Sequence, residues 1–263
     1  MPVSLADTIT LNRSYAQVAM SLSVDPAINI SNIGPMERNL AVRAARLLQN
    51  RYRVNEGVRI HIHKRIPIGG GMGGGSADAA GVLRGLNRLW NLNLPVGELE
   101  SLGAELGSDI PALVHGGVVL MEGRGERVSS IQLPDEWEDK GIWMVIANPG
   151  IMCSTAEIFR KWKGDLTDSL QILHNMLSFI RENQLDSLAT GLYNGLQSVV
   201  FDGYPEVAQA VQLLQEAGCL GALLSGSGAS VFGLVRNKAH GEEVSRRLGK
   251  TIWNTVVRAC PVV

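Results

Sequence analysis

The chain has 263 residues, 45% of them hydrophobic, so it can bury a substantial core as one large domain or two modest ones. Its 24 basic and 25 acidic residues nearly balance and are interspersed, which argues against a nucleic-acid partner. We expect no membrane association, because the sequence has no signal-like N-terminus and no apolar run near the roughly 18 residues needed to span a bilayer.

The cysteines are few and scattered. Cys153, Cys219 and Cys260 are odd in number and far apart, a pattern that fits a reducing compartment better than a disulfide framework or a zinc site. We therefore expect a cytoplasmic protein. The sequence does not decide between a monomer and a homodimer.

The first third of the chain alternates helical and extended patterns. Apolar residues recur at helical spacing over 40–48, and residues 58–63 alternate as a half-buried strand does. A further helix is expected to begin near Ser76 and to end by Asn91. The glycine-rich stretch "PIGGGMGGGSADAAG", residues 67–81, therefore links a strand to a helix.

A helix over 97–105 and the segment "LGSDIPALV" come next. They are followed by a hairpin with Gly123 and Gly125 at its turn. The apolar strand "IWMVIANPG" then stops at Pro149. We place a domain boundary at this point, near residues 147–150.

The remainder of the chain is mainly helical at first and then mixed. Its final elements follow the order α-β-β-α-β, which is most of a split βαβ sandwich. The expected helices are 155–162, 167–182, 186–200, 205–217 and 238–248, and the expected strands are 220–225, 229–235 and 251–259.

The glycine stretch has the chemistry of a phosphate-binding loop. Glycine permits positive φ and a close approach of backbone to ligand, so a glycine-rich loop at a helix N-terminus can direct several N–H groups at one anion. Ser76 would serve either as the N-cap or as a hydroxyl donor to a phosphate or a metal-bound water. The alternative is a flexible loop without a ligand. The stretch is neither a Walker A loop nor a dinucleotide fingerprint.

Two further segments become candidate site elements when they are considered together with the glycine stretch. "LLSGSGASVF", residues 223–232, contains Ser225 to Gly228, which alone would indicate a tight hairpin turn. Asp109 in "GSDIP" stands at an expected helix start, where it would either cap the helix or orient and deprotonate a hydroxyl nucleophile.

Together the three segments, in this order and at these separations, resemble the signature regions of the GHMP kinases. The resemblance extends to "SLADTIT", "NLAVRAARLL", "HKRIP", "LRGLNRLWNL" and "NPGIMCSTAEIF", and so covers nearly the whole chain. It implies an α/β (α+β) class and the two-domain GHMP kinase fold. Residues 1–147 would form the S5-like, ATP-binding N-terminal domain, and residues 148–263 the ferredoxin-like C-terminal domain.

The resemblance also implies an activity. The "GGGSADAA" form of the loop is typical of one branch, which transfers the γ-phosphoryl of ATP, with Mg²⁺, to the 2-hydroxyl of cytidine-diphospho methylerythritol in the non-mevalonate isoprenoid pathway. Asp109 would be the catalytic base, and Thr155 and Phe159 would bind the acceptor, with Phe159 stacked on cytosine. The residues implied in binding ATP are Gly69, Gly70, Gly71, Gly73, Gly74, Gly75 and Ser76 around the phosphates, Asn39, Lys64 and Pro67 on the adenine side, and Ser225, Gly226, Ser227 and Gly228 from the second domain. No metal ligand is assigned.

One departure from the family is large. Members ordinarily begin with a Pro-Ala-Lys strand and a Gly-Tyr-His segment, and neither occurs in these 263 residues. We therefore expect the N-terminal domain to be truncated at its start, through a misplaced start codon or a shortened cloned gene. A catalytically impaired nucleotide-binding homologue, an active variant that uses another lysine, and a kinase for another small alcohol are the alternatives.

Two smaller features favour structural roles. His61 and His63 lie on one face of a strand and lack an evident third ligand, so we interpret them as part of an exposed strand face rather than a metal site. Asp78, in the first turn of the helix after the loop, would repel phosphate if it faced the ligand. We expect it to point away.

Overall fold

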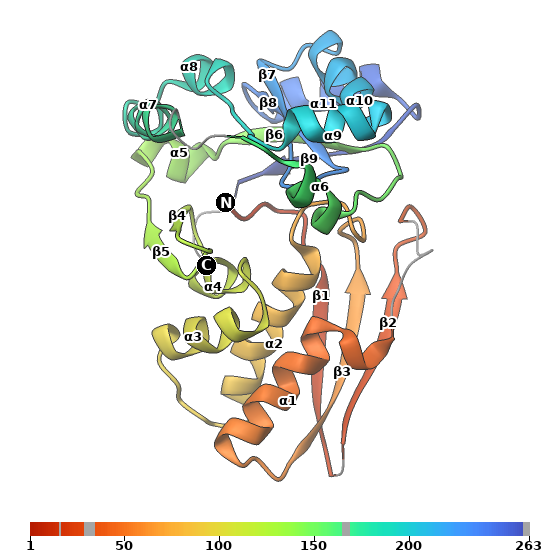
Figure 1. Cartoon of the computed structure of the whole chain (residues 1–263), viewed down its shortest axis with the longest axis vertical. Coiled ribbons are helices and arrows are strands. Elements are labelled where there is room, and N and C mark those ends of the chain that lie inside the picture. Colours follow the sequence, from red (N-terminus) through yellow and green to blue (C-terminus); the bar gives the residue numbers. More distant parts are fainter. Residues whose placement is uncertain (16, 29–34, 165–168, 260–263) are drawn as a thin grey trace. The chain divides into compact units, whose positions relative to one another are not determined.

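The computed structural model describes residues 1–15, 17–28, 35–164 and 169–259, which fold into two compact units (Figure 1). Unit 1 comprises residues 1–68 and 73–131. Among the described residues, unit 2 comprises 69–72, 132–164 and 169–259. Both contain helices and strands, as the sequence predicts.

Unit 1 is built on a three-stranded sheet with the order β1-β3-β2. The central strand β3 (Gly57–Lys64) pairs antiparallel with β1 (Thr8–Ser14) and parallel with β2 (Val18–Val24). The predicted alternation in β3 is confirmed, because Val58, Ile60 and Ile62 are all buried. β1 and β2 were not predicted from the sequence.

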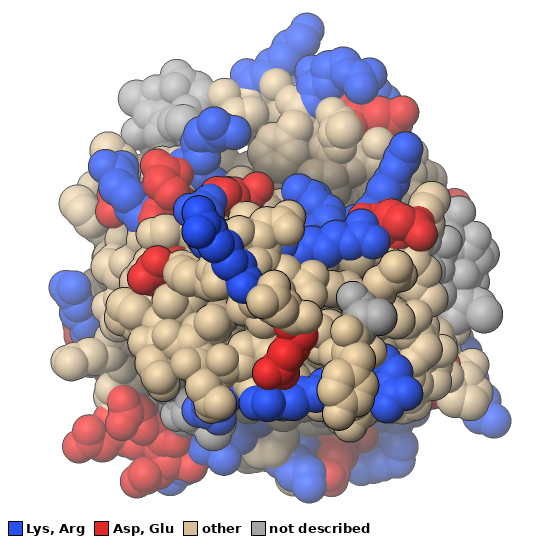
Figure 2. All heavy atoms as spheres, turned by 90° about the horizontal axis from the view of Figure 1, so that it is seen from below, with Lys and Arg blue, Asp and Glu red and all other residues tan. Residues whose placement is uncertain are grey.

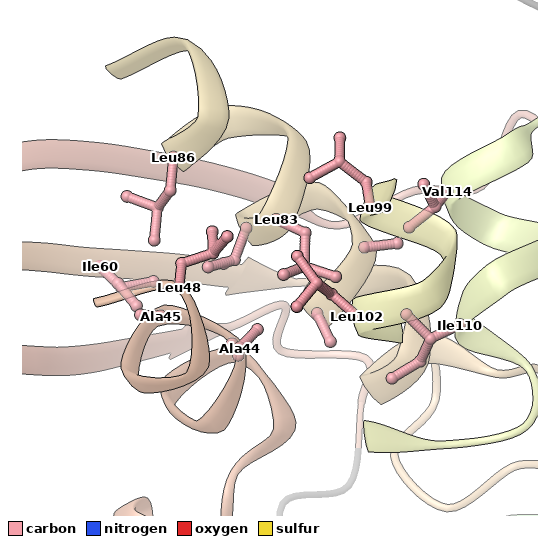
Figure 3. Packing of buried hydrophobic residues seen from close by; sticks show 14 of the residues in the cluster. Ala44, Ala45, Leu48, Ile60, Leu83, Leu86, Leu99, Leu102, Ile110 and Val114 are labelled. Atoms are coloured by element: carbon pink, nitrogen blue, oxygen red, sulfur yellow. The ribbon is translucent and has the colours of Figure 1, made fainter. Parts of the chain in front are cut away.

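Helices cover the buried face of this sheet. α1 (Leu40–Tyr52) and α2 (Gly74–Leu89) pack against each other, and Figure 1 shows them along the same side of the sheet. α3 (Val96–Leu106) and α4 (Ile110–His115) pack beside α2, and the short helix η1 spans Met36–Arg38. Figure 3 shows the apolar core that these elements share, including Ala44, Ala45, Leu48, Ile60, Leu83, Leu86, Leu99, Leu102, Ile110 and Val114.

The predicted hairpin is also confirmed. β4 (Val119–Glu122) and β5 (Arg127–Ser130) pair antiparallel, and Gly123 and Gly125 in their turn both adopt positive φ. Only glycine adopts such values at little cost, which explains why the turn falls there.

Unit 2 contains a four-stranded antiparallel sheet with the order β7-β8-β6-β9. With its two crossing helices this is the ferredoxin-like arrangement, and the predicted α-β-β-α-β order is confirmed. The strands are β6 (Trp143–Asn148), β7 (Gly221–Leu224), β8 (Val231–Val235) and β9 (Trp253–Arg258), and the helices are α5 (Asp135–Lys140), α6 (Thr155–Lys161), α7 (Ser169–Arg181), α8 (Leu185–Thr190), α9 (Gln197–Gly203), α10 (Pro205–Glu216) and α11 (Lys238–Leu248).

One helix prediction is wrong. The segment predicted as one helix over 186–200 forms α8 and α9, which are separated by residues 191–196. Asn194 explains the break, because its side chain accepts from Leu196 N locally and donates to a distant loop. The first two residues of the predicted helix 167–182 lie outside the described residues.

The described cysteines are free thiols. Burial raises the pKa of Cys153 to about 11 and that of Cys219 to about 12, so both stay protonated at neutral pH. Cys260 lies outside the described residues.

No helix in the described part of the chain is long and apolar enough to cross a bilayer. Basic and acidic side chains both occur around the face drawn in Figure 2, in keeping with the formal net charge of −1.

Candidate functional site

α2 begins at a glycine within the glycine stretch, and its N-terminus carries no side-chain cap. Gly73 occupies the N-cap position in the left-handed region, with φ 66° and ψ 17°, and α2 begins at Gly74 rather than Ser76. Ser76 therefore lies in the first turn, which excludes its alternative role as N-cap. The first-turn amides have no partner one turn earlier in the helix, and the helix dipole adds positive potential there. This end of α2 is suited to hold an anion.

The earlier part of the stretch, residues 69–72, packs within unit 2 against the other glycine-rich loop. Ser225 Oγ donates to the carbonyl oxygen of Gly71 at 3.1 Å, and the Ser230 amide donates to the carbonyl oxygen of Gly70 at 2.9 Å. A side chain on Gly71 would lie 2.5 Å from the carbonyl oxygens of Ser225 and Gly228. Two segments that the sequence separates widely are thus in direct contact.

The loop over residues 225–230 is fixed by polar side chains of unit 2. Asn194 Nδ2 donates to the carbonyl oxygens of Leu224 (3.0 Å) and Gly226 (2.8 Å). The buried Asn148 Nδ2 donates to Ser230 Oγ at 2.8 Å. These bonds specify the loop conformation more closely than a hairpin turn alone requires.

Thr155 and Phe159, the predicted acceptor residues, both lie on α6. Thr155 Oγ1 and Ser227 Oγ are 2.7 Å apart and share a hydrogen bond. Phe159 is 56% exposed, a large value for an aromatic side chain. The structure leaves its ring available to stack on a planar ligand.

Asp109 stands at the start of α4, as predicted, but it does not cap this helix. Its side chain makes no capping hydrogen bond, and no ion pair or hydrogen bond of its carboxylate occurs within the described residues. The residue is exposed. A carboxylate that has no structural bond to maintain is free to accept a proton from a ligand.

Lys64 is buried in an ion-paired group that we call the Lys64 cluster, formed by Asp7, Lys64 and Asp78. Lys64 Nζ donates to Asp78 Oδ2 at 2.7 Å and also pairs with Asp7 Oδ2. The three side chains are 3–8% exposed. Burial raises the pKa of Asp78 to about 6, although the Lys64 ammonium opposes this shift.

The other two residues implied on the adenine side are in unit 1. Asn39 is the N-cap of α1, and its side chain accepts from Ala41 N at 2.9 Å. Pro67 follows shortly after β3 and is partly exposed. The adenine contacts of Asn39, Lys64 and Pro67 stay predictions.

The histidine pair on β3 is engaged by the neighbouring strand. Ser21 and Ser23 of β2 place their hydroxyls within 2.9–3.1 Å of ring nitrogens of His61 and His63. No group of three or more potential metal ligands occurs among the described residues. The role of the Ser76 hydroxyl toward a phosphate or a metal-bound water stays a prediction.

Three residues with clear structural roles around these elements were not identified from the sequence. Asp7, Asn148 and Asn194 each contact a partner at least 30 residues away. Their structural roles depend on contacts with residues distant in sequence, and no local spacing pattern predicts such contacts. For Asn194, the segment "YNGLQ" held a weak signal of a break in the helix, because its glycine interrupts a helical pattern.

Comparison with known proteins places the chain in a family. The family model described as "GHMP kinases N terminal domain" matches residues 39–117. The model described as "GHMP kinases C terminal" matches residues 176–253. The boundary near 147–150 falls outside both matches and stays a prediction.

Two relatives and one solved structure are named as the same kinase. The chain is 44% identical over 200 residues to 4-diphosphocytidyl-2-C-methyl-D-erythritol kinase of Bacillus subtilis (strain 168), covering 76% of this chain and 67% of the relative. It is 42% identical over 248 residues to the protein of the same name from Gloeobacter violaceus, covering 92% and 78%. Among solved structures, a 4-(cytidine 5'-diphospho)-2C-methyl-D-erythritol kinase superposes with a TM-score of 0.73 at 29% identity, covering 98% of this chain and 88% of that one. Matches in both halves and relatives at this identity show that the chain belongs to the GHMP kinase family.

Proposed function

We propose that this chain transfers the γ-phosphoryl group of ATP to the 2-hydroxyl of 4-diphosphocytidyl-2-C-methyl-D-erythritol, in isoprenoid biosynthesis in the cytoplasm. The uncapped N-terminus of α2, preceded by Gly73 in the left-handed region, is the observation that carries the proposal. It offers backbone donors and a helix dipole to a phosphate, and relatives that are 42–44% identical to the chain are named as kinases for that acceptor.

The phosphates would be bound mainly by backbone. The amides of Gly74, Gly75 and Ser76 are the donors that α2 leaves unpaired, and the hydroxyl of Ser76 would reach a phosphate oxygen or a metal-bound water. In unit 2, Gly69 to Gly71 and the Ser225–Gly228 segment would supply further backbone groups to the nucleotide. Mg²⁺ would neutralise charge on the phosphate oxygens when bound.

Asp109 would act as the general base. The 2-hydroxyl oxygen of the acceptor attacks the γ-phosphorus, the bond from that phosphorus to the β–γ bridging oxygen breaks, and ADP leaves. The hydroxyl proton passes to the Asp109 carboxylate. The exposed position of Asp109 and its lack of a capping bond support this role, because the carboxylate need not give up a structural contact to accept the proton.

The acceptor would be recognised through its cytidine. The exposed ring of Phe159 would stack on cytosine, and Thr155, held by Ser227, would contribute a hydroxyl. On the adenine side, Asn39 and Pro67 remain candidates. The ammonium of Lys64 pairs with two carboxylates, so an adenine contact of this group would use its third N–H donor.

The test is ADP release that depends on the acceptor. We expect release by the wild type with 4-diphosphocytidyl-2-C-methyl-D-erythritol and a decrease of kcat of about 10²- to 10⁴-fold in Asp109→Asn. Asp139→Asn, at an exposed position in α5, is the matched control and should leave the rate unchanged. Release only with mevalonate, homoserine or galactose would overturn the acceptor, and equal rates in wild type and Asp109→Asn would overturn the base.

A further inference from the structure

The Lys64 cluster joins the two chain segments that flank the glycine stretch. Lys64 is the last residue of β3, and Asp78 lies in the second turn of α2. Asp7 extends the connection, because its Oδ1 accepts from the amides of Arg65 (2.6 Å) and Ile66 (2.9 Å) while its Oδ2 pairs with Lys64 Nζ. One buried ammonium and two carboxylates therefore hold the end of β3 against the beginning of α2.

The cluster lies close to the first residue of α2. A side chain added at Gly74 would come within 3.6 Å of Lys64 Nζ and within 3.0 Å of Ile66 Cγ2. The backbone that offers the first-turn amides is thus packed directly on the residues that the cluster fixes. A change in the Lys64 cluster would therefore be expected to displace those amides through direct contacts.

The Lys64 cluster is expected to contribute little net stability to the fold. Removing charges from water costs free energy that an ion pair often fails to recover, and apolar residues of similar volume are frequently as stable. In the described part of the chain, Asp78 Oδ1 has no hydrogen-bond partner, which adds to the cost. A costly buried charge at this place favours a role in function.

We infer that the Lys64 cluster positions the first turn of α2 for the donor nucleotide, with Asp7 and Asp78 as positioning residues. This inference rests on the proposed function. Fixing the two ends of a loop before a ligand arrives lowers the ordering cost of binding, so the amides of Gly74 to Ser76 present one geometry to the phosphates of ATP. Lys64 also offsets the negative charge of Asp78 near an anion site.

A simple charge effect and a positioning effect predict opposite changes in the ATP affinity of Asp78→Asn. Asp78→Asn removes a negative charge near the phosphates, so charge alone predicts tighter ATP binding. If the ion pair positions the helix, the same substitution weakens binding, because a neutral amide cannot replace the carboxylate that holds the ammonium. We expect the dissociation constant for ATP, measured by calorimetry, to rise about tenfold in Asp78→Asn and at least as much in Lys64→Met.

The control and the pH profile complete the test. Glu105→Gln breaks the exposed Arg51–Glu105 pair in the same unit and should bind ATP as the wild type does. Because the pKa of Asp78 is raised to about 6, ATP affinity of the wild type should weaken below that pH more than the affinity of Asp78→Asn, with both proteins sharing the titration of ATP itself. The wild-type profile is informative even if Lys64→Met fails to fold.

The outcomes separate the two proposals. If the wild type binds no ATP, the proposed function fails. If the wild type binds ATP and Asp78→Asn binds it equally or more tightly, with the same pH profile, the positioning role is overturned and the proposed function stands.

Discussion

Ser225 Oγ donates a hydrogen bond to the carbonyl oxygen of Gly71 across 154 residues of sequence. The contact is close enough that no side chain fits at Gly71, where an added carbon would lie 2.5 Å from two backbone oxygens and φ is +71°. Glycine at this position is therefore a requirement of the packed loops themselves.

Gly71→Ala should therefore disturb unit 2 even without nucleotide. We expect a loss of about 1–3 kcal/mol in the free energy of unfolding, because the new methyl group meets backbone and the residue is forced to a left-handed φ. Urea unfolding measures this loss. Gly97→Ala is the matched control, since nothing lies within 4 Å of an added carbon there, and it should be neutral or slightly stabilising. Equal stability of Gly71→Ala and the wild type would contradict the packing described for this loop.

Asn194→Ala should loosen the loop over residues 225–230. The substitution leaves the carbonyl oxygens of Leu224 and Gly226 without their donor, at an expected cost of about 1–3 kcal/mol. Amide hydrogen exchange should become faster in that loop. Gln212→Ala removes an exposed side-chain bond on α10 and should change neither quantity. Unchanged exchange in Asn194→Ala would show that other contacts fix the loop.

The stability of unit 1 should depend on pH through Asp78. Its pKa is about 6 in the folded protein and 3.8 when unperturbed, so folding takes up a proton between these values. The free energy of unfolding of the wild type should therefore fall, relative to that of Asp78→Asn, as pH rises from about 4 to about 6. Denaturant unfolding at several pH values measures the difference. A difference that is constant across this range would show that Asp78 does not titrate there.

Phe159→Ala should weaken binding of the acceptor without affecting stability. Stacking on a base contributes about 1–3 kcal/mol, so KM for the acceptor should rise roughly tenfold or more while KM for ATP stays constant. The ring is 56% exposed, and its removal should cost little packing energy. Leu170→Ala, at a side chain that is 65% exposed in α7, is the control. An unchanged KM for the acceptor would place cytidine recognition elsewhere.

The sequence predicted most elements of the fold because their patterns are local. The alternation in β3, the stripe of α1 and the glycine turn of the β4–β5 hairpin each follow from spacing within one element. β1 and β2 were missed, since both are half-buried strands at the edges of the sheet and carry weaker patterns. The helix over 186–200 was wrong because Asn194 bonds to a loop 30 residues away.

The candidate residues divide in the same way. Gly73 and Asp109 were identified because a glycine-rich loop and an acidic residue at a helix start are visible in the sequence. The partners of Lys64 were not, because the carboxylate of Asp7 lies 57 residues from Lys64 in the chain and only the folded unit brings them together. Asp78 was expected to point away from phosphate; the structure buries it beside Lys64, and its orientation relative to a bound phosphate stays a prediction.

The strand order of unit 1 also constrains how the chain acquires its fold. β1 and β2 are consecutive in sequence, yet among the described strands each pairs only with β3, which lies between them. On a ribosome, therefore, β1 and β2 have no partner among the described strands until residues 57–64 have been added. Loop closure over such distances slows folding and leaves strand edges exposed meanwhile. The unpaired edges of β1 and β2 are thus a site for self-association during synthesis until β3 pairs with both strands.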